Sequence, residues 1–409
     1  MLSHEDVEGV AGELLASAGL ELLHSEQLQA LWADYGFIYA VEAKRIASTA
    51  SVSSQKFLVG DPLEGDGKLR LVLKIISPQD AKSEEGHLRK LFSYEVEQYF
   101  YDRLAPLLPP SVKVANCLCS TRYLAPGVAG GERRVTATLM TDLREQFPVA
   151  GEKRSDLTVA QVYSAIKWLA DFHGSSWSMR DDHTMHGLLL PPLDELEARR
   201  TVKELPPRSI WRSGGYTYLA TRQTEYASLA RRSNSEWSAV FCKHEGTATI
   251  AEKVARFLNP KGRSFETFIH GDVKSENLFS TESGDSVAFF DFQYVGLGLG
   301  ASDLAKLFTC CVPLHMLVDR SAPLPDKIAM QQGELNLLRQ YHQLLTRYET
   351  TDGTKYDFSD FQRHWETALV DWCRFQASWG FWGNTGWLQG RVRSVVCDES
   401  WRNWLNQQV

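Results

Sequence analysis

Hydrophobic spacing divides the chain into a mixed first third and a mostly helical remainder. In the first third, alternation and β-branched residues indicate strands, and the clearest is the run from Leu69 to Ile76. The elements predicted there are, in order, helices at about 5–18 and 25–34, strands between 35 and 76, a helix at about 86–105, and a strand pair at about 113–125 and 133–141. We therefore expect a small β-sheet with a few helices in this part of the chain.

A change of pattern near residues 142–150 marks the expected lobe boundary, which gives an N-terminal lobe of 1–145 and a C-terminal lobe of 146–409. Thr158 and Gln161 form a capping-box signature that opens a helix after this boundary. Later helices are predicted at about 216–232, 236–258, 301–311, 334–349 and 359–379, with one β-rich island at 265–270, 277–280 and 286–292. The last two strands of the island should form a hairpin.

Charge and composition narrow the range of partners. The 409 residues carry 44 Lys and Arg against 51 Asp and Glu, a net charge of -7, so the chain lacks the positive field that nucleic acid requires. Apolar runs fall short of the ~20 residues needed to span a bilayer, and the acidic N-terminal segment does not resemble a signal peptide. The seven cysteines include no C-x-x-C pair, so neither a zinc site nor a disulfide framework is indicated. We expect a cytoplasmic globular protein with no nucleic-acid partner and no membrane span.

The β-rich island carries the strongest chemical signal, which consists of H-G-D-x-x-x-x-N at 270–277 and D-F-Q at 291–293. Phosphoryl transfer needs a carboxylate that accepts the proton of the attacking hydroxyl, and oxygen ligands that hold Mg²⁺ on the phosphates. Asp272 is the candidate base. Asn277 and Asp291 are the candidate metal ligands, because they stand at neighbouring strand ends of one hairpin.

Together, the two motifs resemble those of the aminoglycoside phosphotransferase and choline kinase superfamily, whose members phosphorylate small molecules. Gly271 and Gln293 stand where a protein kinase has the Arg of H-R-D and the Gly of D-F-G, and the chain contains no A-P-E. Further stretches are similar to the ecdysteroid-kinase-like branch, at 93–101, 214–225, 290–300 and 371–384. The resemblance implies an α+β, protein-kinase-like two-lobe fold with a small mixed β-sheet in the N-terminal lobe and a mainly helical C-terminal lobe.

The same resemblance implies ATP and Mg²⁺ as cofactors and assigns further residues to the nucleotide. Lys74 should reach the phosphates from a strand, paired with a glutamate on the next helix. Spacing to the following aromatic pair matches the family at Glu97, whereas the apolar stripe of the helix favours Glu95; Glu97 is taken as the partner. The remaining assignments are Ser51, in a glycine-free loop at 45–54, for the phosphates, and Met140 and Asp142 beside the adenine.

Aromatic residues near the C-terminus predict the acceptor side. Seven of the twelve tryptophans lie between residues 365 and 404, and helical spacing assigns three of them, Trp365, Trp372 and Trp379, to a buried face of the helix at 359–379. The stretch Trp379–Asn384 contains two glycines and could instead present aromatic rings to a substrate. Such a pocket suits a flat hydrophobic alcohol or, with an acid such as Asp371, an amine.

These observations predict an ATP-dependent small-molecule kinase that transfers the γ-phosphate to a hydroxyl of a hydrophobic or amine-bearing metabolite. One alternative is a choline- or ethanolamine-type kinase, which would take a small amino alcohol. The other is a catalytically silent pseudokinase that serves as a binding module.

Overall fold

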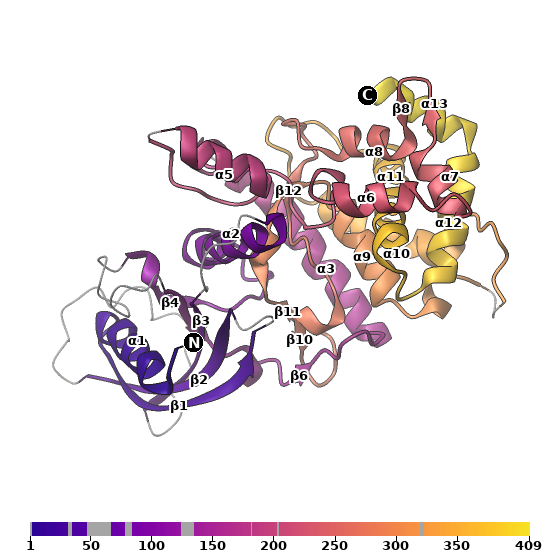
Figure 1. Cartoon of the computed structure of the whole chain (residues 1–409). Helices are drawn as coiled ribbons and strands as arrows, with labels where there is room; N and C mark the ends of the chain where they lie inside the picture. Colours follow the sequence, from indigo (N-terminus) through magenta and orange to yellow (C-terminus); the bar gives the residue numbers. More distant parts are fainter. Residues whose placement is uncertain are drawn as a thin grey trace. The chain divides into compact units, whose positions relative to one another are not determined.

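The computed structural model describes residues 2–31, 35–46, 67–77, 84–123, 135–180, 182–202, 204–319 and 323–409. The chain forms two compact units. The first comprises residues 1–107 and 114–145, and the second comprises residues 108–113 and 146–409. Figure 1 labels the helices and strands of both units.

The first unit contains a five-stranded antiparallel sheet in the order β1-β2-β3-β5-β4. Its strands are β1 (Leu20–Ala30), β2 (Gly36–Arg45), β3 (Lys68–Ile76), β4 (Cys117–Ser120) and β5 (Thr136–Thr141). Helix α1 (His4–Ser17) buries Val10 and Leu14 in the same hydrophobic core as Leu73 of β3 and Leu139 of β5. The sheet therefore has one face covered by α1, which explains the alternating pattern of its central strands.

Helix α2 (Glu85–Tyr99) follows β3 in the chain and continues into a π-helical turn, Phe100–Leu104. Phe92 and Val96 are buried on the same helix as Glu97. The helix predicted at about 86–105 is thus confirmed in place, with a change of helical type over its last five residues.

The helix predicted at about 25–34 is wrong, because residues 25–30 belong to strand β1. Strand β1 pairs with β2 from Leu20↔Arg45 to Ala30↔Phe37, so its backbone groups are satisfied across the sheet. Leu28 remains 42% exposed, which shows that the apolar spacing here does not mark a buried helical face. Strand pairing outweighs a weak local preference for helix.

The second unit is mainly helical, as predicted. Its helices are α3 (Val159–Ser175), α4 (Asp182–His186), α5 (Pro192–Thr201), α6 (Gln223–Ala230), α7 (Glu236–Cys242), α8 (Ile250–Leu258), α9 (Ala301–Cys310), α10 (Gln332–Leu345), α11 (Phe358–Trp379), α12 (Thr385–Cys397) and α13 (Glu399–Gln408). Figure 1 shows α11 within this bundle, and it packs against α8, α9 and α12. Trp365 and Trp372 of α11 are buried, as are Trp387 and Trp401, so most of the C-terminal tryptophans build the core.

The long helix predicted at about 236–258 is instead two helices, α7 and α8, separated by the short hairpin of β7 (His244–Glu245) and β8 (Ala248–Thr249). Gly246 has a φ of 75°, a left-handed conformation that interrupts a helix. Thr249 then restarts the helix by accepting a hydrogen bond from the Glu252 amide. Similarly, α6 begins later than its predicted start at 216, because a 3-10 turn precedes it.

The β-rich island consists of β9 (Thr267–Ile269), β10 (Leu278–Ser280), β11 (Val287–Phe289) and β12 (Gly296–Gly298), and β6 (Val149–Ala150) also pairs with β10. The predicted hairpin is confirmed: β10 pairs with β11 in antiparallel register. Strand β12 pairs with β9, so the chain after the D-F-Q motif returns to the strand that leads into H-G-D. The island thereby holds both motifs at the ends of short, buried strands.

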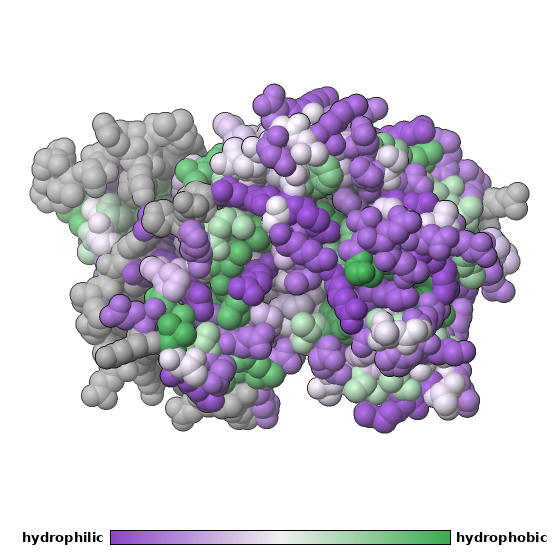
Figure 2. All heavy atoms as spheres, turned by 90° about the horizontal axis from the view of Figure 1, so that it is seen from above, coloured by the Kyte–Doolittle hydropathy of each residue, from purple (hydrophilic) through white to green (hydrophobic). Residues whose placement is uncertain are grey.

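Hydrophobic side chains are mostly inside the molecule. Figure 2 shows a mainly hydrophilic surface on the described residues, with hydrophobic side chains exposed in small groups. Among the helices of the described part of the chain, none is both long and apolar enough to cross a membrane.

A buried histidine in the core of the second unit makes stability depend on pH. His364 of α11 is 7% exposed and lies 2.5 Å from the Tyr356 hydroxyl through Nδ1. Burial, and then the charge of Arg263, lowers the pKa of His364 from 6.5 to about 3. The folded protein therefore resists a proton that the unfolded chain accepts.

We expect the free energy of unfolding to fall as the pH drops from 6.5 towards 3, with His364 contributing up to about 1.4 kcal/mol per pH unit. In His364→Gln, urea unfolding between pH 7.5 and 4.5 should show a shallower pH dependence than in the wild type. His244→Gln, at an exposed position, is the control and should keep the wild-type slope. Equal slopes for wild type and His364→Gln would contradict the assignment.

Candidate active site

In the second unit, the chemical motifs lie where the strands of the β-rich island end. Residues 270–272 follow β9, Asn277 directly precedes β10, and Asp291 comes two residues after β11. The Phe290 amide donates to the Asn277 carbonyl at 3.0 Å, which extends the β10–β11 hairpin by one rung. Asn277 and Asp291 therefore belong to adjacent strand ends, as the sequence predicted.

Asp272 and Asn277 are in direct contact. Asn277 Nδ2 donates to the Asp272 carbonyl oxygen at 2.9 Å and to Asp272 Oδ2 at 3.2 Å. Both side chains are buried. Because both bonds use the amide nitrogen, the amide oxygen of Asn277 can serve as a ligand for a cation.

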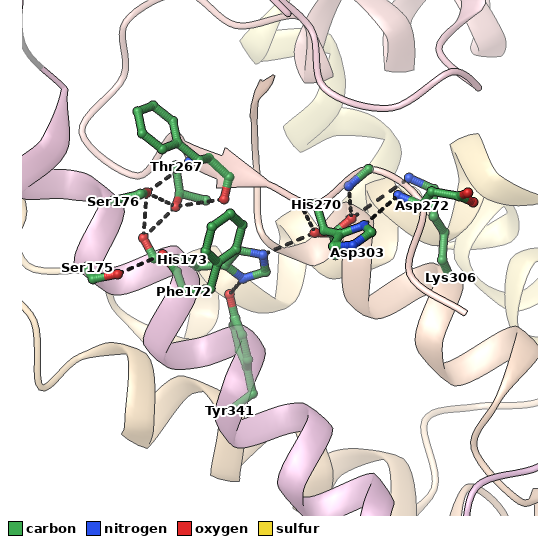
Figure 3. A network of polar contacts seen from close by, with 12 residues as sticks. Phe172, His173, Ser175, Ser176, Thr267, His270, Asp272, Asp303, Lys306 and Tyr341 are labelled. Carbon is green, nitrogen blue, oxygen red and sulfur yellow. Dashed lines mark hydrogen bonds and ion pairs between the residues drawn. The ribbon is translucent and has the colours of Figure 1, made fainter. Parts of the chain in front are cut away.

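The loop that carries Asp272 is held by a second, fully buried aspartate, Asp303 at the start of α9. The amide of His270 donates to Asp303 Oδ2 at 2.6 Å, and the amide of Gly271 donates to Oδ1 at 2.9 Å. Figure 3 shows Asp303 between this loop and His173. One carboxylate therefore fixes two successive peptide groups next to Asp272.

Asp303 is itself held from the opposite side by His173 of α3. His173 Nε2 lies 3.2 Å from Asp303 Oδ2, and its Nδ1 lies 2.7 Å from the hydroxyl of Tyr341 on α10. Burial acts to raise the pKa of Asp303, but the His173 hydrogen bond and the charge of Lys306 outweigh it and lower the pKa. Asp303 is thus a charged group in the interior.

Glycine is required at position 271. Gly271 has a φ of 83°, and a Cβ there would lie 2.4 Å from the carbonyl oxygen of Tyr294 and 2.8 Å from Gly215 Cα. No side chain fits at such distances without moving backbone atoms. The glycine of H-G-D thus allows the chain to turn tightly between β9 and Asp272.

His270 is a structural residue of the loop. Its Nε2 lies 3.0 Å from the Phe290 carbonyl oxygen, and its Nδ1 accepts a hydrogen bond from the Asp272 amide at 3.3 Å. Burial lowers the pKa of His270, which outweighs the neighbouring carboxylates. A neutral imidazole that donates through Nε2 and accepts through Nδ1 satisfies both contacts.

Lys274 was given no role from the sequence, yet it contacts the candidate base. Its Nζ lies 3.0 Å from Asp272 Oδ2 and 3.9 Å from Glu276 Oε1. Burial acts to lower the pKa of Lys274, but the charges of Asp272, Glu276 and Asp291 outweigh it and raise the pKa. The signal that could have revealed it is its place two residues after Asp272, inside the motif itself.

Asp291 has a left-handed backbone, with a φ of 66° and a ψ of 57°. Among the described residues only one other non-glycine residue, Arg154, has a positive φ. A non-glycine residue in this region costs about 1–3 kcal/mol, which the surrounding fold must supply. Such strain is typical of functional sites.

Cation binding here would rely on few protein ligands. The described residues contain no group of three or more His, Cys, Asp or Glu side chains placed to hold a metal ion. Mg²⁺ in phosphoryl-transfer sites needs only one or two carboxylates, because the phosphates and water complete its shell. The carboxylate of Asp291 and the amide oxygen of Asn277 fit that donor chemistry.

The first unit carries the predicted nucleotide residues. Lys74 Nζ of β3 lies 2.6 Å from Glu97 Oε2 of α2, and both side chains are buried. The same ammonium lies 5.8 Å from the centre of the Tyr94 ring. Glu95, the competing candidate, is more exposed than Glu97. The ion pair present in the fold is therefore the one with Glu97.

Two of the other assigned residues are also placed. Met140 of β5 lines a small hollow together with Lys74 and Glu97. Asp142, just after β5, accepts hydrogen bonds from the amide and the side chain of Arg144 at 2.9 Å. Ser51 lies outside the described residues.

The chain combines an antiparallel sheet unit with a helical unit that carries H-G-D-x-x-x-x-N and D-F-Q. This combination defines the protein-kinase-like fold of small-molecule kinases. A sequence profile of the ecdysteroid kinase-like family matches residues 59–326. Because this match covers more than half of the chain, the protein belongs to the ecdysteroid kinase-like family. The resemblance read from the motifs is thereby confirmed.

Solved structures with similarity to the chain include three phosphotransferases. An ethanolamine kinase from Plasmodium vivax is 11% identical, with a TM-score of 0.38, over 96% of this chain and 84% of the other. Choline kinase LicA from Streptococcus pneumoniae is 14% identical, with a TM-score of 0.38, over 99% and 100%. Macrolide 2'-phosphotransferase MphH from Brachybacterium faecium is 12% identical, with a TM-score of 0.41, over 99% and 97%. Curated proteins gave no match. The assignment depends on the family match, since these TM-scores are below 0.5.

The position of Asp303 predicts a large effect of a small substitution. Asp303→Asn replaces one acceptor oxygen by an amide that cannot accept from both backbone N–H groups and His173. We expect it to lower the free energy of unfolding by about 3 kcal/mol, the usual cost of breaking a buried charged network. Asp285→Asn, on the exposed hairpin turn, makes the same chemical change and should leave stability close to wild type. Similar urea midpoints for the two variants would refute the bracing role.

Proposed function

We propose that the protein is an ATP-dependent kinase that transfers the γ-phosphate of ATP to a hydroxyl group of a small molecule. The observation that carries this proposal is the contact of Asp272 with Asn277, beside the strand end that bears Asp291. A base and two oxygen ligands for Mg²⁺ are the minimum that phosphoryl transfer requires from a protein. Family membership supports the same class of reaction.

Each candidate site residue of the second unit has a role in this proposal. Asp272 orients the acceptor hydroxyl and accepts its proton as the oxygen attacks phosphorus. Asn277 and Asp291 hold Mg²⁺, which supplies charge neutralisation on the phosphates when bound. Lys274 holds the carboxylate of Asp272 in place through their ion pair and offers positive charge close to the transferred group. Asp303 acts through the backbone and is a positioning residue.

The first unit supplies the nucleotide contacts of the proposal. Lys74, oriented by Glu97, donates to the α- and β-phosphates. Met140 and Asp142 are proposed to lie beside the adenine, and Ser51 is proposed to contact the phosphates. We therefore expect Lys74→Met to raise the Kd for ATP by a larger factor than it lowers kcat.

The decisive experiment measures ADP release with Mg-ATP and three pools of acceptors: steroid alcohols, amino alcohols and aminoglycosides. The wild type should release ADP with one pool. Asp272→Asn should lower kcat by about 10²- to 10⁴-fold, the usual contribution of a general base, while the Kd for Mg-ATP changes little. Asp291→Asn should instead weaken ATP binding in the presence of Mg²⁺. Asp285→Asn is the matched control on the exposed turn.

The outcomes separate the kinase from the alternatives. Turnover with the amino-alcohol pool alone would favour the choline- or ethanolamine-type kinase. Mg-ATP binding without turnover in any pool would favour the silent binding module over a kinase for these three acceptor classes. An Asp272→Asn protein with wild-type kcat would overturn the assignment of the base.

Lys274 provides an independent test of the site. Lys274→Met removes the ammonium that lies 3.0 Å from Asp272, and we expect kcat to fall by about 10- to 100-fold because charge on the transferred group is less well stabilised. The Kd for ATP measured without acceptor should move far less. Lys253→Met, at a partly exposed position on α8, controls for loss of a lysine. Unchanged kcat in Lys274→Met would remove this residue from the mechanism.

A further inference from the structure

The hydroxyl of Tyr341 on α10 is a buried polar group for which the proposed mechanism has no use. Tyr341 is 1% exposed, and its hydroxyl oxygen lies 2.7 Å from His173 Nδ1. Figure 3 shows this contact at one end of a series that continues through His173 and Asp303 to the loop of Asp272. Tyr341 is thus connected to the candidate base without touching it.

The space around this hydroxyl is closely filled. Gly300 directly precedes α9, and a Cβ at Gly300 would lie 2.2 Å from the Tyr341 hydroxyl oxygen and 2.6 Å from His173 Nδ1. The Tyr341 ring also stacks on that of Phe361, with centroids 5.3 Å apart. The ring and its hydroxyl are therefore fixed between α3 and the residue at which α9 starts.

The hydroxyl proton of Tyr341 needs an acceptor. Burial raises the pKa of Tyr341 well above its usual range, and Tyr356 and Asp303 add to this, so the hydroxyl keeps its proton. A buried O–H group without an acceptor is costly. Within the described part of the chain, the hydrogen bond of this hydroxyl is the one with His173 Nδ1. Nδ1 is therefore the acceptor and carries no proton.

Asp303 fixes the state of the other ring nitrogen of His173. Nε2 lies 3.2 Å from Asp303 Oδ2. Burial acts to raise the pKa of Asp303, but the His173 hydrogen bond and the charge of Lys306 lower it, so the carboxylate is charged. A charged carboxylate can only accept, which means that Nε2 carries the proton. His173 is therefore the neutral imidazole with its hydrogen on Nε2.

The Tyr341 hydroxyl is what makes this tautomer the favourable one. Without it, no donor faces Nδ1 of His173, and the proton can move there from Nε2. The lone pair of Nε2 would then face the Asp303 carboxylate, and the two groups would repel each other. Because Asp303 accepts the backbone amides of His270 and Gly271, its displacement would pass to the residue that follows them.

We propose that Tyr341 is a positioning residue of the kinase reaction. Its hydroxyl holds His173 in the Nε2–H tautomer, and this tautomer keeps the Asp303 carboxylate in place. The carboxylate in turn fixes the loop that presents Asp272 to the acceptor. This inference rests on the proposed function, because the position of Asp272 matters for turnover only if it is the base.

The kinetic test compares Tyr341→Phe with the wild type in the ADP-release assay. We expect kcat to fall by about tenfold, because a small displacement of the base slows proton transfer. The Kd for Mg-ATP, measured without acceptor, should change by less than about twofold, since the ATP-binding residues keep their places.

Tyr356→Phe is the matched control. Tyr356 is also buried, and its hydroxyl likewise contacts a ring nitrogen, Nδ1 of His364. The control therefore removes the same group from the same kind of contact. It should lower the urea midpoint and keep the wild-type kcat, which separates loss of stability from loss of positioning.

A double variant locates the effect at His173. If Tyr341 acts through the imidazole, removing the imidazole first leaves the hydroxyl nothing to act on. The kcat of His173→Gln/Tyr341→Phe should therefore equal that of His173→Gln alone, rather than show the product of the two losses. Near-ultraviolet circular dichroism checks that each variant is folded.

NMR of protein labelled with 15N in its histidines reports the tautomer directly, because protonated and unprotonated ring nitrogens have different chemical shifts. The His173 signals are those absent from His173→Gln, or from His173→Asn if the first variant is unfolded. In the wild type, Nε2 should be protonated and Nδ1 unprotonated. In Tyr341→Phe the Nδ1 signal should move towards the protonated position, whereas Tyr356→Phe should leave it in place.

Three results would overturn the proposal: a proton on His173 Nδ1 in the wild type, an unchanged kcat in folded Tyr341→Phe, or losses that multiply in the double variant. The first is read from the wild type itself, so the proposal can be refuted even if Tyr341→Phe does not fold. An unchanged kcat with Asp272-dependent ADP release intact would reject the role of Tyr341 alone. Absence of ADP release from the wild type would instead count against the proposed function.

Discussion

The geometry of the second unit depends on a buried charge, the carboxylate of Asp303. It accepts two backbone hydrogen bonds from the loop between β9 and β10 and contacts His173 from the other side. A charge in the interior is stable only when its desolvation is offset by several donors at once. That requirement links α3, α9 and α10 to the loop that carries Asp272, so the helical bundle sets the position of this residue.

Much of this site could be predicted because its signals are local. The H-G-D-x-x-x-x-N and D-F-Q motifs lie at the ends of short strands, two of which form one hairpin, and the β-forming character of those strands is visible in the sequence. Lys74 was assigned because the family resemblance implies a lysine on a strand, and the run that contains it is clearly β-forming. The choice between Glu95 and Glu97 needed more, because both lie near the apolar stripe of one helix and only the fold shows which one pairs with Lys74.

Other features could not be predicted, because they depend on contacts between distant residues. Asp303 is separated from His173 by 130 residues and His173 from Tyr341 by 168, and no local pattern joins them. The segment that ends β1 was mistaken for a helix because its pairing with β2 outweighs its own spacing. Arg222 belongs to the stretch 214–225 that resembles the family, but no sequence pattern shows that it lies against three rings from two parts of the chain.

The left-handed backbone at Asp291 has an evolutionary consequence. Glycine adopts this conformation without the steric cost that aspartate bears. A single replacement by glycine would therefore relieve local strain while deleting the proposed metal ligand. Selection for stability and selection for catalysis then act in opposite directions at one codon. A lineage released from the need for turnover could drift at this position first and become a folded, non-catalytic binder.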